Sequence, residues 1–359
     1  MLRFLLKRFL LVIPVLFGIL LVTFFLARAI PGDPCRAVLG ERATDEVCDA
    51  YFERQGLNEP VPVQFAVYTR NILLHGDLGT SLRFQRPVTE LLAERLPVTM
   101  ELTLLAIIFA AVVGVPLGII SAYRHNSAID VGTMIGANIG VSMPVFWLGL
   151  MLSYIFGVAL RDTMFALPPS GRLTPGANPD PFYMVWGMLE DPDMASSLLV
   201  FISRLNIVNA ILTGNWELLG DSLRHLILPA IAVGTIPLAI IARMTRSSLL
   251  EVLGQDFIRT ARAKGVRERT VVLRHGVSNA LLPVVTIIGL NFGFLISGAV
   301  LTETIFGFTG IGKTLFDGIT ARDYTLVQGV TLSTAVAFVF INLFVDLLYG
   351  YLDPRIRLS

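Results

Sequence analysis

The residues whose types and spacing could perform chemistry are few, and the most specific group is a nucleotide-binding pattern. Residues 307–314 read GFTGIGKT and match G-x-x-x-x-G-K-[ST] at every fixed position, at Gly307, Gly312, Lys313 and Thr314. In a true P-loop this pattern follows a buried β-strand and opens a helix whose first N–H groups bind phosphates. Whether the segment binds ATP therefore depends on what precedes Gly307 and on which side of a barrier Lys313 lies.

Other arrangements of catalytic or metal-binding residues are missing from the sequence. No H-E-x-x-H, H-x-x-E-H or G-x-S-x-G motif occurs, and the four histidines are far apart: His75, His125, His225 and His275. Cys35 and Cys48 can close a disulfide in an oxidising compartment, and two free, buried thiols are the alternative. Two cysteines and distant histidines supply too few ligands for a metal site, so we expect none.

Long apolar runs without charge predict that the chain crosses a membrane. The chain is 54% hydrophobic and 15% charged, whereas soluble domains are about 25% charged. A span needs about 20 apolar residues, and six charge-free runs approach or exceed this length: 9–27, 102–122, 131–160, 226–242, 276–302 and 324–345. We therefore expect an all-α polytopic membrane protein with six transmembrane helices. Six buried helices of a soluble protein would need polar faces, which these runs lack.

The few ionisable residues near these runs lie at their ends. Arg28, Glu101 and Asp346 can be explained by snorkelling or by helix-terminus effects, and Glu101 is expected near the start of the second helix. A proton-coupled carrier more often places a carboxylate in the middle of a span. The basic start of the first run resembles a signal peptide, but Arg28 interrupts the candidate cleavage site, so we expect a retained helix.

The distribution of Lys and Arg predicts the orientation. Four pieces hold 14 basic and five acidic residues, leaving out Asp346, and are assigned to the cytoplasm: 1–8, 123–130, 243–275 and 346–359. Three pieces hold 13 basic and 20 acidic residues and are assigned to the outside: 31–96, 161–225 and 303–323. Both termini are therefore expected in the cytoplasm, in a multi-pass protein of the plasma (inner) membrane.

This orientation argues against ATP binding at residues 307–314. Those residues are expected outside, where there is no ATP pool, and an apolar helix rather than a strand precedes them. We interpret the P-loop match as a coincidence. The glycines and Thr314 are expected to form a tight turn, after which a short helix begins at Lys313.

The chain divides into a first helix, a cap and a core. We expect a transmembrane helix at 1–30, an extracytoplasmic cap at 31–96 with helices at 43–57 and 58–76, five transmembrane helices within 97–350, and a cytoplasmic tail at 351–359. The core contains an outer insertion at 161–225, in which 194–203 and 205–216 read as interfacial helices or as a re-entrant pair. Pro144, with Gly140 and Gly149, indicates a kinked or closely packed helix in the third run.

The cytoplasmic loop at 243–279 is too long for a simple connector and has helical periodicity. Phe257, Ile258 and Ala261 give one apolar side together with Val271 and Val272, and five basic residues give the other: Arg259, Arg262, Lys264, Arg267 and Arg269. Two short helices meeting at Gly265 would project from the membrane. Periodicity alone leaves two alternatives open, a docking element for a soluble partner and a basic patch that lies on anionic lipid.

At this loop the sequence resembles the cytoplasmic coupling loop of binding-protein-dependent ABC importer permeases. It is most similar to the B-type subunit of the oligopeptide, dipeptide and nickel transport family. The similar stretches follow the family order along nearly the whole chain: MLRFLLKRFLLVIPVLFGI, IPGDPCRAVLGERAT, GDLGTSLRFQRPVTELLAERLPVTMELTLLA, SMPVFWLGL, LPPSGR, LPAIAVG, RSSLLEVLGQDFIRTARAKG, RHGVSNALLPVVT, ETIFGFTGIGKTLFDGI and LDPRIRL. In this family the G-I-G stretch follows an outer turn, as it does here.

The resemblance implies a type I ABC importer permease that forms half of a translocation pore. Its coupling loop would fit a groove on an ATPase subunit, with Asp256, Phe257, Ile258, Arg259, Thr260, Ala261, Arg262, Ala263, Lys264 and Gly265 at the family positions. The implied partners are a second permease chain, two ATPase subunits that bind ATP and Mg²⁺, and an extracytoplasmic binding protein. The chain itself would be neither an enzyme nor a cofactor- or nucleic-acid-binding protein. The insertion at 172–222 and the two cysteines depart from the family pattern, which puts the outer docking surface in doubt.

Peptides are the expected cargo, and nickel chelates or another small solute are the alternative. A stand-alone carrier or channel, which would need no coupling loop, and a membrane enzyme, which would need a clustered polar site, are alternatives of a different class. The candidate pore-lining residues are polar positions in the third and fifth runs: Asn138, Ser142, Ser153, Asn291 and Ser297. Hydrogen bonding between helices would explain these residues equally well.

Overall fold

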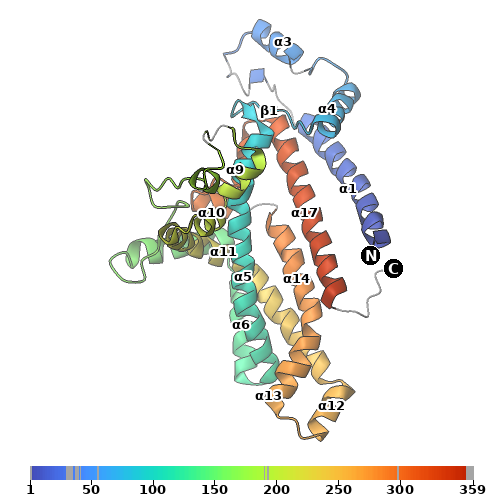
Figure 1. Cartoon of the computed structure of the whole chain (residues 1–359), viewed down its shortest axis with the longest axis vertical. Coiled ribbons are helices and arrows are strands. Elements are labelled where there is room, and N and C mark those ends of the chain that lie inside the picture. Colours follow the sequence, from blue (N-terminus) through green and yellow to red (C-terminus); the bar gives the residue numbers. More distant parts are fainter. Residues whose placement is uncertain are drawn as a thin grey trace.

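The computed structural model describes residues 2–29, 35–36, 40, 42–54, 56–189, 191, 194–296 and 299–352. It is an elongated assembly of helices with one short hairpin (Figure 1). Among the described residues, four helices are long and apolar enough to cross a membrane: Val88–Tyr123, Trp216–Leu253, Glu268–Ile296 and Tyr324–Val345. A bent helix pair, Ala128–Ser142 with Val145–Ala159, would make a fifth span. The shorter apolar helix Leu10–Leu26 lies in the first predicted run.

The segment before α5 (Val88–Tyr123) contains one long helix and a cap. Helix α1 spans Leu2–Ala29, and the cap contains α3 (Asp45–Arg54) and α4 (Val61–His75). Pro60 precedes α4, and Gly76 ends it in the left-handed region. Proline is common at the start of a helix and glycine just after its end. In Figure 1 the cap lies at one end of the molecule, where α1 reaches α4. The two cap helices confirm the helical segments expected at 43–57 and 58–76.

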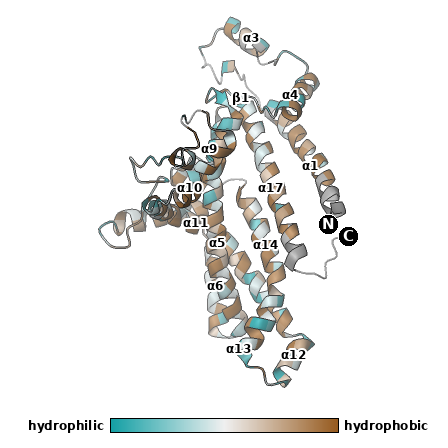
Figure 2. Cartoon of the chain, viewed as in Figure 1, coloured by the Kyte–Doolittle hydropathy of each residue, from teal (hydrophilic) through white to brown (hydrophobic). Residues whose placement is uncertain are grey.

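Helix α11 forms the centre of the core. It spans Trp216–Leu253 and packs most extensively on α5 (Val88–Tyr123). Helices α6 (Ala128–Ser142) and α14 (Ser278–Ile296) also contact α11, and α17 (Tyr324–Leu352) packs on α14 and α1. In Figure 2 apolar residues predominate along α5, α14 and α17, whereas hydrophilic residues gather near the two ends of the molecule.

Small residues allow the long helices to approach closely. A Cβ at Gly118 of α5 would lie 2.6 Å from the carbonyl oxygen of Ala242 in α11, and one at Gly114 would lie 2.8 Å from that of Leu238. Gly293 of α14 meets the ring of Phe338 in α17 in a similar way. Glycines spaced four residues apart bring helix backbones together where the hydrophobic effect cannot drive association.

The third apolar run is a broken helix rather than a straight span. Helix α6 ends at Ser142, and α7 (Val145–Tyr154) begins after a bend of 98°. A π-helical segment, η1 (Ile155–Ala159), then continues α7 without a break. Pro144 lies in this break and provides the kink that the sequence indicated. Gly149 packs on Phe306, as expected for a closely packed position, because its Cβ would lie 3.2 Å from that ring.

The outer insertion contains short helices that pack on the core. These are α8 (Phe182–Val185), α9 (Ser197–Ser203) and α10 (Asn206–Thr213). Helix α9 packs on α5, and α10 packs on α11. The two short helices lie within the two weakly apolar stretches that the sequence singled out. Neither is long enough to span a membrane.

Candidate functional site

The predicted coupling loop lies at the end of the molecule opposite the cap (Figure 1). Helix α12 (Asp256–Ala263) follows α11 after a turn at Gly254, and α13 (Glu268–Thr270) leads into the π-helical segment η3 (Val271–Val277). Helix α12 packs on η3, which also contacts α11 and α14. One of the two expected short helices, α12, is present and is followed by a turn at Gly265. The second is not a separate short helix, because α13 is the first turn of a continuous helix that runs from Glu268 to Ile296.

The apolar side predicted for this loop is divided between two surfaces. Ile258 is completely buried and Val271 and Val272 are buried, so these residues hold α12 against η3. Phe257, by contrast, is 46% exposed, and Ala261 is half-buried. The prediction of a single apolar face was wrong in this respect, because adjacent residues of a helix point about 100° apart. The exposed Phe257 ring is available to a partner, whereas Ile258 is not.

A left-handed glycine and an ion pair fix the turn between α12 and α13. Gly265 has a φ of +73°, a conformation that costs little only for glycine. The Arg262 guanidinium donates to the Glu268 carboxylate at 2.7 and 3.1 Å. These hydrogen bonds raise the pKa of Arg262 above its usual range. The turn therefore presents a defined shape rather than a loose connection.

A buried carboxylate ties α6 to α11 near this end of the molecule. Asp130 is 3% exposed and accepts two hydrogen bonds from Arg246, each at 2.7 Å. Ser121 of α5 donates to the same carboxylate, as does the backbone N–H of Asn126 at 3.0 Å. Charge-assisted bonds of this kind are roughly twice as strong as neutral ones. The cluster joins α5, α6 and α11, and sequence reasoning missed it because 116 positions separate Asp130 from Arg246.

A second buried carboxylate occupies the position that a phosphate would need in the P-loop pattern. Helix α15 (Val300–Ile305), not a strand, precedes Gly307, and α16 (Ile311–Thr320) follows Gly310. Glu303 is fully buried, and its carboxylate accepts from the Lys313 N–H at 2.8 Å and from the Thr99 hydroxyl at 2.6 Å. The chain therefore fills the anion site at this helix N-terminus with its own carboxylate.

Two details of the expected geometry around the P-loop pattern were wrong. Helix α16 begins at Ile311, two residues before Lys313, so Gly312 and Thr314 lie in its first turn rather than in the preceding turn. The Thr314 hydroxyl donates back to the Gly310 carbonyl at 2.7 Å. Gly307 alone of the three glycines, with a φ of +67°, has the left-handed conformation of a tight turn. The glycine-rich sequence thus serves a helix start that approaches Glu303 closely.

Glu101 anchors the outer insertion rather than stabilising a helix start. Helix α5 begins at Val88, so Glu101 lies more than three turns inside it, and the expected helix-terminus role was wrong. Its carboxylate, which is 4% exposed, accepts from Arg172 at 2.5 Å and from the Ile207 N–H at 2.7 Å. Arg172 also donates to the Arg204 carbonyl at 2.8 Å. One carboxylate therefore holds two distant parts of the insertion against α5.

The predicted pore-lining residues do not form one cluster. Asn138 accepts from Arg243 at 3.2 Å, and Ser153 donates to the Pro169 carbonyl at 3.1 Å. Ser142 and Asn291 donate to backbone carbonyls one turn earlier in their own helices. Ser297 lies outside the described residues. Hydrogen bonds within their own helices account for Ser142 and Asn291, and bonds to other segments account for Asn138 and Ser153. The assignment of these residues to a pore stays a prediction.

The two cysteines form a disulfide in the cap. Cys35 and Cys48 are joined, with both side chains buried. The bond connects the segment after α1 to α3, so it closes the outermost part of the cap onto itself. Free, buried thiols, the alternative that the sequence left open, do not occur at these two positions.

Comparison with known proteins identifies the family. Residues 114–358 match the profile of binding-protein-dependent transport system inner membrane components, and residues 1–103 match the N-terminal profile of such membrane components. The chain belongs to this family. A dipeptide transport system permease protein of Alkalihalophilus pseudofirmus is 46% identical over 357 residues, which cover 99% of this chain and 100% of the relative.

Further relatives carry related names. A di/tripeptide transport system permease protein of Pseudomonas aeruginosa is 43% identical, with 99% of each chain covered. A glutathione transport system permease protein of Pectobacterium atrosepticum is 37% identical, again with 99% of each chain covered. Members of this family are membrane components of transport systems that work with a binding protein. The chain is accordingly a multi-pass membrane component of an ABC transport system and not itself an enzyme.

Proposed function

We propose that this chain is the permease subunit of an ATP-driven importer and forms half of the pore through which peptides pass. The observation that carries the proposal is the similarity over the full length to permeases of dipeptide and di/tripeptide systems. The projecting α12 supports it, because a stand-alone carrier or channel has no need of such an element. Two of the dipeptide permeases are 46% and 43% identical to this chain, which favours peptides over nickel chelates or other small solutes.

The proposed membrane arrangement has six spans. Helix α1 would be the first and the bent α6–α7–η1 unit the third, in addition to the four helices that are long enough by themselves. Both termini and α12 would lie in the cytoplasm, and the cap and the insertion outside. The disulfide supports this orientation, since disulfides persist in oxidising compartments. The proposed units are the helix at 1–30, the cap at 31–96, the core at 97–350 and the tail at 351–359.

The proposed partners each have a place on this arrangement. Two cytoplasmic ATPase subunits would bind ATP and Mg²⁺, and one of them would receive Phe257 and the exposed basic residues of α12. A second, homologous permease chain would complete the pore. An extracytoplasmic binding protein would deliver the peptide to the cap and insertion side. ATP-driven closure of the ATPase pair would then move α12 and, through it, the long helices.

A substitution at the turn after α12 tests the coupling role. Gly265→Trp should leave membrane insertion intact but separate peptide uptake from ATP hydrolysis. A Cβ at Gly265 would meet no atom of this chain within 4 Å, so the chain itself leaves room for the side chain. A loss of coupled uptake would therefore come from the positive φ at this position or from the bulk that the indole presents to a partner. The measurement is peptide uptake, with ATP hydrolysis alongside, in vesicles that contain the complete transporter.

Gly214→Trp is the matched control for this experiment. Gly214 ends α10 in the outer insertion with a φ of +67°, and a Cβ there also meets no atom within 4 Å. Both variants therefore carry the same kind of backbone strain, about 1–2 kcal/mol for a left-handed residue. Wild-type uptake by the Gly265 variant would refute the coupling role. Equal loss of uptake in both variants would assign the effect to strain instead.

A further inference from the structure

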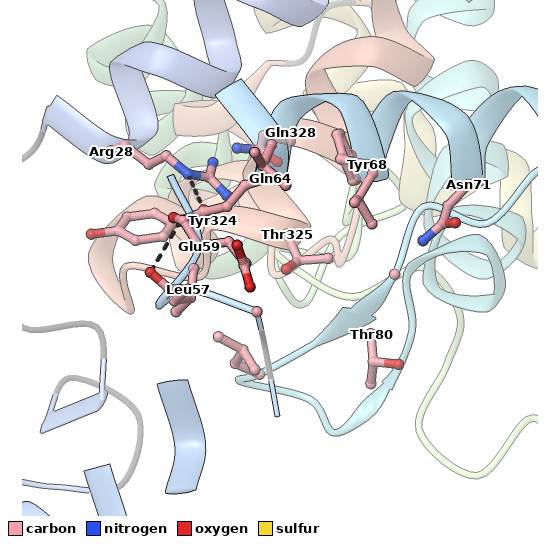
Figure 3. A pocket seen from close by; sticks show the side chains of 15 residues that line it. Arg28, Leu57, Glu59, Gln64, Tyr68, Asn71, Thr80, Tyr324, Thr325 and Gln328 are labelled. Atoms are coloured by element: carbon pink, nitrogen blue, oxygen red, sulfur yellow. Dashed lines mark hydrogen bonds between the residues drawn. The ribbon is translucent and has the colours of Figure 1, made fainter. Parts of the chain in front are cut away.

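A cavity of about 250 Å³ lies where α1, α4 and α17 meet beneath the cap (Figure 3). One water molecule occupies about 30 Å³ of liquid, so the cavity has room for a group much larger than a single water. It lies at the cap end of α1 and α17, away from α12. No role assigned above to coupling or to the P-loop pattern involves it.

Arg28 supplies the positive charge of this cavity. Its guanidinium carbon lies 3.4 Å from the centroid of the Phe24 ring, its Nε donates to Gln64 at 2.9 Å, and one terminal nitrogen donates to the Phe24 carbonyl at 3.4 Å. A guanidinium has five N–H donors, and three of them have no acceptor among the described residues. Within the described part of the chain, no carboxylate lies within ion-pair distance of Arg28 or acts on its charge. The residues that the structure describes therefore position this cation without neutralising it.

Two further donors around the same cavity have no partner among the described residues. They are the Gln328 side-chain nitrogen and the Tyr68 hydroxyl. Gln328 is only 3% exposed. Burial raises the pKa of Tyr68 above its usual range, which keeps the hydroxyl protonated and able to donate. Buried polar atoms are almost always hydrogen-bonded. A cation and two unpaired donors that share one cavity favour an occupant with several acceptor oxygens and negative charge.

The rim of the cavity is apolar on the α4 side. Val63 and Val67 line it and are 44% and 53% exposed. Glu59, the carboxylate among the lining residues, is exposed to solvent at the edge. An inorganic anion would gain nothing from these two valines. An amphiphile would place its charged group inside and its hydrocarbon against them.

We infer that this cavity binds the phosphate of an anionic phospholipid head group, with the acyl chains along the exposed apolar residues of α1 and α4. The depth fits, because the cap end of helices that cross a membrane is where head groups lie. Basic pockets between transmembrane helices hold anionic head groups on the cytoplasmic side of membranes, and this cavity would use the same chemistry at the cap end. The assignment does not depend on which solute the transporter carries.

Lipid binding to the purified full-length chain with its partner subunits tests this inference. After removal of lipid, the complex is titrated with phosphatidylglycerol, phosphatidylcholine and inorganic phosphate, and bound molecules are counted by native mass spectrometry. Wild type should prefer phosphatidylglycerol. Arg28→Gln should weaken that binding roughly tenfold or more, the value of a lost charge-assisted hydrogen bond. Arg70→Gln is the matched control, since Arg70 is an exposed residue of α4 that does not line the cavity.

A second variant separates a ligand role from a structural one. Gln328→Met removes a donor that makes no hydrogen bond in the structure, so it should weaken phosphatidylglycerol binding while leaving thermal stability equal or higher. Equal binding of phosphatidylglycerol by wild type, Arg28→Gln and Gln328→Met would overturn the inference. Inorganic phosphate that binds as tightly as the lipid, and competes with it, would also overturn it in favour of a site for a free anion.

Discussion

Replacing Phe257 with alanine should weaken attachment of the proposed ATPase subunit without destabilising this chain. A phenylalanine side chain has roughly 200 Å² of surface, and 46% of Phe257 is exposed, which leaves roughly 90 Å² for a partner to cover. At about 25 cal/mol per Å² this area corresponds to about 2 kcal/mol. The affinity of the ATPase subunit for the permease should therefore fall roughly thirtyfold.

The assay is the equilibrium binding of purified ATPase subunit to the membrane-embedded permease pair in nanodiscs. Leu273→Ala is the matched control, because Leu273 of η3 is also 46% exposed and lies at the same end of the chain. Ile258→Ala is the contrasting variant. It creates a cavity under α12 and should lower the free energy of unfolding by about 2–5 kcal/mol. Any loss of binding would then follow from that destabilisation.

Unchanged ATPase affinity in Phe257→Ala would refute this reasoning. It would mean that the exposed ring faces water or lipid in the assembled transporter, and that the basic residues of α12 carry the contact. Equal losses in Phe257→Ala and Leu273→Ala would also contradict it, because the effect would then follow from exposed apolar area at this end in general.

Two further perturbations probe the packing and the cap. Gly118→Leu should lower the free energy of unfolding by about 1–3 kcal/mol or prevent assembly, because its side chain would enter the contact with Ala242 of α11. Fluorescence-monitored melting in detergent measures this change. Reduction of the Cys35–Cys48 bond should cost the cap about 3 kcal/mol in the chain-entropy model, given a sequence separation of 13; limited proteolysis should then cut within 35–48 faster while the core stays intact.

The controls for these two predictions come from the same chain. Gly132→Leu on α6 should be tolerated, since a Cβ at Gly132 meets no atom within 4 Å. Destabilisation of both glycine variants to the same degree would contradict the close-packing argument. Melting of the whole chain on reduction, rather than local proteolysis, would show that the cap and the core unfold together.

The positions of most helices could be predicted from the sequence, because lipid requires long apolar segments and glycine and proline mark their ends. Within the described residues, each of the six charge-free runs lies mainly on helix, and Pro144 marks the break in the third one. The same residues contain fewer lone spans than the six runs suggest. A run of apolar residues reports solvent preference, and it cannot report that α6 and α7 are bent by 98° relative to each other.

The partners of the buried carboxylates could not be predicted from the neighbouring sequence. Asp130 reads as an N-terminal residue of α6, and its partner Arg246 reads as one charge among many in a basic loop. Glu303 reads as part of an outer turn, although it receives the N-terminus of α16. Each pairing joins segments distant in the chain or depends on the exact start of a helix. Periodicity contains neither piece of information.

The polar residues chosen for the pore illustrate a different limit. Asn138, Ser142 and Asn291 were selected because polar groups are rare within apolar runs, and each has a hydrogen-bond partner nearby. A polar side chain in a span therefore says that a partner exists, and the partner is often only one turn away. Backbone geometry is a better guide than residue type to where solute and water could pass.

The break at Pro144 restricts what can surround this part of the chain in a way that a continuous helix would not. The proline ring has no N–H to offer the carbonyl of Gly140, so that oxygen must obtain a hydrogen bond elsewhere. Hydrocarbon chains have no donors, and irregular backbone at membrane depth persists only against protein or water. If α6 and α7 cross the membrane together, the side of the molecule that carries this break cannot be wetted by lipid. The break then marks, within a single chain, the face that a second subunit or a column of water has to cover.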